Sequence, residues 1–338
     1  MRAEYCDKVL LYNIVGEFAE GDYVRNQLYQ RNFKARLIGW LSVGVIFISM
    51  NASSATTSSD SADFTIVTSI EPLALIVSDL LAQTPNAPAI DVVSLLSANV
   101  DPHHYALKVS DRKTLAEADL ILWIGPEMER FLEKVMGSLP ENRQIQVESV
   151  PGISWPIIEG YHEQENSHSH EGYDPHFWLN PDNIKQLQRV LVGWLTQQAG
   201  VNSNIEAIGE QWDLVVERLQ QRMLPLNSMR YGVYHDGFRH FTQFFGLESP
   251  YVVSAGGGQP LSAKRVFEIQ KELQKASCLL VEPGALNAMM KRLHETTGVT
   301  LLPVDILGVN KPATIAELIE NVAQGFEQCY RLGQSGKE

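Results

Sequence analysis

An apolar run that ends in Gly-Pro, ADLILWIGPEMERF (residues 118–131), indicates a buried β-strand followed directly by a helical segment. Residues 118–125 are almost continuously apolar, which is typical of a strand that is covered on both faces. From Pro126 onward the apolar residues follow a helical period instead. The two patterns together predict a strand–helix unit of an α/β fold.

The same alternation continues along the chain in both directions from this unit. The predicted strands are 64–69, 90–96, 118–125 and 145–150 in the first half, and 231–236, 249–254, 278–283 and 299–305 in the second half. Helix-like stretches follow Pro72, Ser110 and Pro126. Strands that are separated by helices form parallel sheets with helices on both faces, so we expect two α/β lobes.

A helical pattern of apolar residues lies between the two halves, with Asn204 suited to cap its start and no proline until Pro225. We therefore expect one long rigid helix that joins the lobes. The resulting division of the chain is an N-terminal extension with a signal peptide (1–55), a flexible leader (56–63), an N-terminal lobe (64–201) with a His-rich loop (159–174), the linking helix (202–226) and a C-terminal lobe (227–332).

Length and composition agree with an ordinary two-domain globular protein. The chain has 338 residues, of which 44% are hydrophobic and 20% are charged, so disorder, collagen and coiled coil are excluded as the main state. The formal net charge is −13. Since no basic field is available to gather phosphates, we expect no nucleic-acid partner.

The N-terminal region carries one strongly apolar segment, LIGWLSVGVIFISM (37–50). Its fourteen residues are too few to cross a bilayer core of roughly 30 Å as a helix. Basic residues precede the segment and small residues follow it, which is the pattern of a secretory signal. We expect export to the periplasm; the alternative is an uncleaved membrane anchor.

Two cysteines lie in the expected folded part, Cys278 and Cys329. An even pair in a chain exported to an oxidising compartment predicts a disulfide. The alternative is a pair of buried thiols.

Histidine and aspartate recur in loops that follow predicted strands, where an open parallel sheet places its ligands. The motifs are DPHHYALKVSD (101–111), YDPHFWLNP (173–181), YHDGFRHF (234–241) and LPVDILG (302–308). Three imidazoles with a carboxylate or a water form a ligand set that suits tetrahedral Zn²⁺. Because the motifs come from both halves, we expect the metal to lie in the cleft between the lobes.

These motifs, together with EADLILWIGPEMERF, resemble in order and rough spacing those of the metal-binding subunits of bacterial ABC transporters, the cluster of zinc and manganese solute-binding proteins that includes ZnuA. The resemblance covers residues 64–330. It implies that His103, His176 and His235 are metal ligands, and that Asp305 is the fourth ligand or lies just behind the ligands. Family members that select manganese tend to have a carboxylate in place of His235, so the resemblance favours zinc. It also implies a disulfide between Cys278 and Cys329.

The function that the resemblance implies is a high-affinity periplasmic zinc solute-binding protein that catalyses no reaction. Its partner would be a membrane permease that is powered by a separate ATPase, and we expect the protein to be a monomer. The alternatives are a manganese or iron carrier of the same cluster and, in a different class, a three-histidine zinc hydrolase. A hydrolase needs a general base, and the sequence contains no H-E-x-x-H arrangement.

Other histidines are less clearly assigned. His162, His168 and His170 alternate with glutamates in the His-rich loop, where they form either a weak second metal site or a solvated polar loop. His104 should point away from the cleft if His103 points into it. For His240, where the family more often has an aromatic residue, a surface or packing role is favoured over a role near the ligands.

Overall fold

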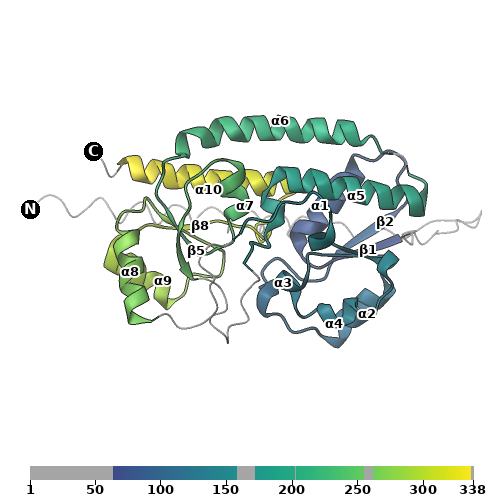
Figure 1. The fold of residues 1–338 in the computed structure, drawn as a ribbon, viewed down its shortest axis with the longest axis horizontal. Helices are drawn as coiled ribbons and strands as arrows, with labels where there is room; N and C mark the ends of the chain where they lie inside the picture. The colour runs from purple at the N-terminus through teal and green to yellow at the C-terminus, as the bar shows by residue number, and fades with distance from the viewer. Residues whose placement is uncertain (1–63, 158–171, 202, 255–261, 336–338) are drawn as a thin grey trace, which may run out of the picture. The chain divides into compact units, whose positions relative to one another are not determined.

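Two parallel sheets of four strands each form the framework of the protein. The computed structural model describes residues 64–157, 172–201, 203–254 and 262–335, all of which belong to one compact unit (Figure 1). The predicted N-terminal extension, signal peptide and leader, and most of the His-rich loop, lie outside the described residues.

The first sheet has the order β2-β1-β3-β4. Its strands are β1 (Phe64–Thr68), β2 (Ile90–Ser94), β3 (Leu120–Trp123) and β4 (Gln144–Gln146). Val67 of β1 pairs with Val93 on one side and with Ile121 on the other. The central strand β3 is buried along its whole length, as its continuous apolar run predicts.

The second sheet repeats this arrangement in the order β6-β5-β7-β8. Its strands are β5 (Gly232–His235), β6 (Tyr251–Ser254), β7 (Leu279–Val281) and β8 (Leu301–Pro303). In each sheet the first strand lies inside, and the chain adds its next strands on opposite sides of it. In sheets with such a reversal, the carboxyl ends of the strands beside it are the usual ligand position.

Helices pack around the sheets. Those of the first half are α1 (Glu71–Ala82), α2 (Val109–Glu117), α3 (Pro126–Glu129), α4 (Glu133–Met136) and α5 (Pro181–Ala199). Those of the second half are α7 (Arg239–Phe244), α8 (Ala263–Leu273), α9 (Ala288–Thr297) and α10 (Ile315–Ser335). The predicted α/β fold with two parallel-sheet lobes is confirmed.

One predicted strand, 145–150, is partly wrong. β4 ends at Gln146, and Val147–Ser149 form a 3-10 turn. The chain turns there so that the Glu148 side chain lies over Gly125, where a Cβ would be only 2.0 Å from Glu148 Cδ. The apolar pattern of the segment indicates that Val147 and Val150 are buried. A tight turn can bury these residues as well as a strand can.

The helix between the halves is α6 (Ile205–Met223), and it runs beside α10 along the top of Figure 1. Its first turn is capped by Asn204, whose Oδ1 accepts the backbone N–H of Ala207 at 3.1 Å. Its buried face consists of Ile208, Trp212, Leu219 and Met223. Ion pairs join its exposed side to α10, from Arg218 to Glu320 and from Arg222 to Glu327.

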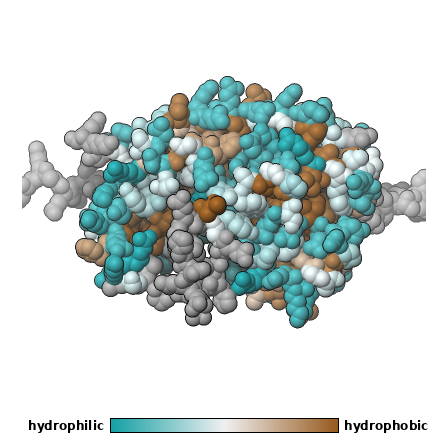
Figure 2. All heavy atoms as spheres, in the orientation of Figure 1, coloured by the Kyte–Doolittle hydropathy of each residue, from teal (hydrophilic) through white to brown (hydrophobic). Residues whose placement is uncertain are grey.

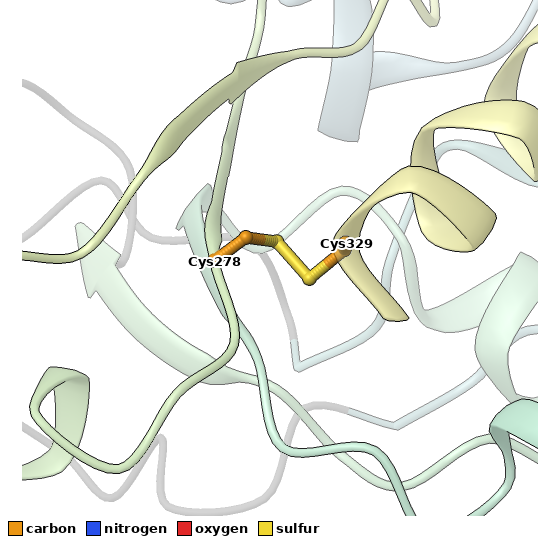
Figure 3. The surroundings of a disulfide bond; sticks show 2 residues. All are labelled: Cys278 and Cys329. Atoms are coloured by element: carbon orange, nitrogen blue, oxygen red, sulfur yellow. A yellow bond between two sulfur atoms is a disulfide. The ribbon is translucent and has the colours of Figure 1, made fainter. Parts of the chain in front are cut away.

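One large hydrophobic cluster extends through both halves, from Ile66 of β1 to Phe326 of α10. A disulfide between Cys278 and Cys329 fastens α10 to the residue before β7, as predicted (Figure 3). Hydrophilic side chains cover most of the described surface that is visible in Figure 2. None of the helices in the described ranges is long and apolar enough to cross a membrane.

Candidate metal centre

His103 lies in the loop that follows β2. The 3-10 turn Pro102–His104 begins at Asp101, whose Oδ1 accepts the backbone N–H of His103 at 2.9 Å. The ring of His104 instead lies with its Nδ1 2.8 Å from Asp101 Oδ2, and 56% of its side chain is exposed. The turn thus gives the two neighbouring histidines different surroundings.

His176 is buried and held by Asp174. One carboxylate oxygen, Asp174 Oδ1, accepts the backbone N–H of His176 at 2.9 Å and lies 2.6 Å from its Nδ1. Because a carboxylate only accepts, Nδ1 carries the proton and Nε2 keeps its lone pair. Burial alone would raise the pKa of Asp174, but the His176 imidazole and its hydrogen bonds outweigh burial and hold the pKa below its usual range. Asp174 therefore stays ionised and orients the ring.

His235 is the last residue of β5, and its carboxylate partner follows β7. His235 Nδ1 lies 3.1 Å from Glu282 Oε1, so this ring also has Nε2 left for a ligand. Burial lowers the pKa of His235, but Glu282, with Asp174 and Asp236, outweighs burial and leaves the pKa above its usual value. Glu282, to which the sequence analysis gave no role, thus lies against a predicted ligand.

The three predicted imidazole ligands lie together. Among the residues that the structure describes, His103, His176 and His235 form the one group of potential metal-binding side chains, with a ligand atom of each within 4.8 Å of the others. The ring centroids of His176 and His235 are 4.8 Å apart, and each is 5.6 Å from that of His103. Residues from three separate segments of the chain are thus brought together.

Gly237 provides space for two of these rings. A Cβ at this position would lie 2.9 Å from His235 Cε1 and 3.0 Å from His176 Cε1. Real Cβ atoms almost never approach other atoms so closely, so a side chain here would displace the rings.

Asp305, the fourth predicted ligand, follows β8 and lies outside the three-histidine group. Its Oδ1 accepts the backbone N–H groups of Leu307 and Gly308 at 3.0 and 2.8 Å, and its Oδ2 accepts that of Asn310 at 2.7 Å. The carboxylate shapes the loop after β8. Its part in metal binding stays a prediction.

Five predicted residues remain, and the structure describes two of them. His162, His168 and His170 lie outside the described residues. Cys278 and Cys329 form the disulfide and offer no thiolate.

The structure places further residues near the three-histidine group. The sequence analysis gave these residues no role at the site, or a different role. Asp174 appeared only as part of the motif at 173–181, and Asn183 was given no role. His240, for which we expected a surface or packing role, is fully buried and has polar contacts with both. The sequence hinted at a special role for position 240, because it holds histidine where the family more often has an aromatic residue. The partners of His240 could not be inferred, because they are distant in the sequence.

Known proteins resemble this chain in sequence over most of its length. Residues 66–329 match the ZnuA family, described as zinc-uptake complex component A, periplasmic. The high-affinity zinc uptake system protein ZnuA of Yersinia pestis is 27% identical over 269 residues, which cover 72% of this chain and 83% of the relative. The protein of the same name from Haemophilus ducreyi is 26% identical over 292 residues, which cover 78% and 92%.

Solved structures share the fold. A crystal structure of ZnuA matches with a TM-score of 0.64 and 20% identity, covering 78% of this chain and 98% of the other. The periplasmic zinc-binding protein TroA of Treponema pallidum matches with a TM-score of 0.61 and 19% identity, covering 79% and 98%. FpvC of Pseudomonas aeruginosa, solved in complex with Mn²⁺, matches with a TM-score of 0.65 and 17% identity, covering 81% and 99%.

Proposed function

The chain belongs to the ZnuA family, and from this membership and the three-histidine group we propose that it captures Zn²⁺ in the periplasm and delivers it to the membrane permease of an ABC transporter. Members of this family are solute-binding proteins that work with ABC transporters, and they are not enzymes. We therefore set aside the hydrolase that the sequence left as an alternative. The identity of the metal and the delivery to a permease with its ATPase are the parts of this function that we propose.

The observation that supports the proposal best is the convergence of three imidazoles, two of which have Nδ1 bonded to a carboxylate. This arrangement leaves their Nε2 atoms as metal donors and makes the rings stronger bases. Nitrogens bound to one tetrahedral Zn²⁺ at about 2.0–2.1 Å lie roughly 3.3 Å apart. Ligand atoms that already lie within 4.8 Å of one another need only a small approach to share an ion.

The ligand set favours zinc over the manganese or iron of the alternative proposal. Three neutral imidazoles suit Zn²⁺, whereas Mn²⁺ is better served by carboxylate oxygens. Asp305 or a water would complete the shell, with Asp305 also holding its own loop.

Alanine at each proposed ligand tests the function. Each of the variants His103→Ala, His176→Ala and His235→Ala should bind Zn²⁺ much more weakly. The apo protein should stay folded, because the three residues come from separate segments of the chain and no one of them supports the whole fold. Competition titration with a chelating indicator measures the affinity, and circular dichroism checks the fold. The control is His104→Ala, which removes an exposed imidazole next to a proposed ligand. Wild-type affinity in any of the three variants would show that the substituted histidine is not a ligand. Tighter binding of Mn²⁺ than of Zn²⁺ by the wild type would show that zinc is not the metal it carries.

The His-rich loop is a second proposed element, which binds a weaker equivalent of Zn²⁺. Ile157 and Tyr173, which flank residues 160–172, pair as an antiparallel bridge, so deletion of 160–172 should preserve the structure around them. The variant should keep one tight site and lose a weaker one, since ligands that a scaffold does not hold in place lose chain entropy when they bind. Equal stoichiometry in the variant and the wild type would show that the loop binds no metal.

Export is the third proposed element, with 37–50 as the apolar part of a cleaved signal. The disulfide is consistent with an oxidising compartment. N-terminal sequencing of the protein from a periplasmic extract should give a start soon after residue 50.

A further inference from the structure

A buried chain of hydrogen bonds connects α7 with the loop that carries His176. His240, the second residue of α7, is 0% exposed. Its Nε2 lies 2.8 Å from the backbone oxygen of Asp174, and its Nδ1 lies 3.2 Å from Asn183 Nδ2. The ring therefore touches two residues that are 66 and 57 positions away in the sequence.

The partners determine which nitrogen of His240 carries the proton. The backbone oxygen of Asp174 only accepts, so Nε2 is the donor. Asn183 Oδ1 accepts the backbone N–H of Ser154 at 2.9 Å, which turns the Asn183 amide nitrogen toward His240 and makes Nδ1 the acceptor. Burial also lowers the pKa of His240, in keeping with a neutral ring.

Asp174 ends this series of hydrogen bonds and is held both by His176 and by the start of α7. Its Oδ1 accepts from the backbone and the ring of His176, whereas its Oδ2 accepts the backbone N–H of Arg239 at 2.9 Å. Together with the bond from His240 to its backbone oxygen, Asp174 receives two hydrogen bonds from the start of α7. The start of α7 lies a few residues after His235 in the chain. The orientation of His176 is therefore tied to the segment that carries another proposed ligand.

We propose that His240 is a positioning residue for metal capture, which acts through Asp174 on the ring of His176. The inference rests on the proposed function, because it concerns the same metal centre. The bond from His240 holds the Asp174 peptide, and the Asp174 carboxylate then holds His176 with Nε2 toward the site. An aromatic residue at position 240 can fill the space and pack against Trp155, but a phenylalanine can neither donate to Asp174 nor accept from Asn183.

Two substitutions separate the hydrogen bond from the packing. His240→Phe keeps the ring shape and loses both polar contacts. His240→Gln loses the ring shape, but its amide can donate to the Asp174 oxygen from the place of Nε2. His294→Gln on α9 is the matched control, since it changes an exposed histidine whose ring contacts the backbone oxygen of Val299.

The readouts are Zn²⁺ affinity by competition titration and the visible absorption of the Co²⁺ complex, which reports ligand geometry. His240→Phe should bind Zn²⁺ more weakly, by up to the roughly 10- to 100-fold that follows the loss of a direct partner of a metal ligand, and it should alter the Co²⁺ bands. His240→Gln should recover most of the affinity and the wild-type bands. Equal losses in both variants, or wild-type binding in His240→Phe, would overturn the proposal, because a packing role predicts that phenylalanine is the better substitute.

A measurement on the unchanged apo protein covers the case in which His240→Phe does not fold. Imidazole nitrogen NMR should find the proton of His240 on Nε2 and that of His176 on Nδ1. The opposite tautomer at either ring contradicts the positioning chain. Failure of the proposed function is seen separately, as the lack of a tight Zn²⁺ site in both the wild type and His294→Gln, and the tautomers then still decide whether His240 orients His176.

Discussion

At Gly237, a missing side chain sets the space for two proposed ligands. The glycine lies two residues after His235 and directly beside the rings of both His176 and His235. The backbone at position 237 does not have the positive φ that favours glycine. Glycine is therefore needed at this position to leave space for the two rings.

Gly237→Ala should therefore weaken Zn²⁺ binding about 10- to 100-fold, comparable to the loss of a supporting partner, while the apo protein stays folded. The reason is that the added methyl group pushes against both rings at 2.9–3.0 Å. Isothermal titration of Zn²⁺ measures the effect.

Gly193→Ala is the control for this substitution. Gly193 lies inside α5, and beyond its own helix backbone and chain neighbours nothing lies within 4 Å of the added Cβ. Alanine there should therefore leave binding unchanged and stabilise the protein by up to about 1 kcal/mol. Unchanged Zn²⁺ affinity in Gly237→Ala would show that the rings have room to move.

On the scale of secondary-structure elements, Glu129 joins two strands to α3. Its carboxylate is 0% exposed; Oε1 accepts from Ser69 Oγ at 2.5 Å, and Oε2 accepts the backbone N–H groups of Ile124 and Gly125, each at 3.0 Å. Ser69 follows β1 and Ile124 follows β3, so one side chain fastens the ends of two neighbouring strands. Burial outweighs these hydrogen bonds and raises the pKa of Glu129 to about 8.

This pKa predicts how stability depends on pH. The ordinary pKa of glutamate is about 4.3, so between about pH 5 and 8 the folded state holds a proton that the unfolded state has lost. The contribution of Glu129 to the free energy of unfolding therefore falls as the pH rises through this range. Glu129→Gln imitates the protonated form, so its stability relative to the wild type should rise with pH.

Chemical denaturation at pH 5, 6.5 and 8 measures this difference. Glu133→Gln, which removes an exposed carboxylate from α4, is the matched control. A difference between Glu129→Gln and the wild type that is constant with pH would mean that Glu129 is ionised in the folded protein throughout. Glu129→Ala should lower stability by roughly 2–4 kcal/mol at pH 5, since it leaves buried backbone donors unsatisfied, and the loss should become smaller as the pH rises.

On the scale of the whole described molecule, α10 connects all the major parts. At its start, the backbone N–H of Ile315 donates to Asp79 Oδ2 of α1 at 2.9 Å. Its middle forms the ion pairs with α6, and Cys329 near its end is bonded to Cys278 before β7. The helix thus holds elements of both halves in one core.

Reduction of the disulfide should lower the melting temperature of the apo protein without abolishing tight Zn²⁺ binding. The bond links residues 51 positions apart, for which chain entropy predicts a contribution of about 4 kcal/mol. Neither cysteine belongs to the three-histidine group. Differential scanning calorimetry and Zn²⁺ titration of the Cys278→Ala/Cys329→Ala variant measure both effects.

The result that would contradict this expectation is a folded variant that has lost tight binding. The metal centre would then depend on the exact placement of α10, and the three loops would not be positioned by the sheets alone.

The sequence by itself determined the α/β class, the two parallel-sheet lobes, the helix between them and the cysteine pair. It also indicated the three histidines, because their motifs lie in loops or at strand ends, where parallel sheets place their ligands, and because these motifs resemble those of the family. These features depend on local periodicity and on neighbours in the chain. For the same reason the end of the strand predicted at 145–150 was wrong, since burial in a turn and in a strand leave the same apolar pattern.

The tertiary structure alone decided which polar groups support the histidines. Glu282 and His235 are 47 residues apart, and His240 and Asp174 are 66 residues apart. No periodic pattern links such pairs, because a single side-chain hydrogen bond leaves no repeat in the sequence. The pairs arise only when both halves fold around one core, and burial then requires each polar group to find the partner that the fold supplies.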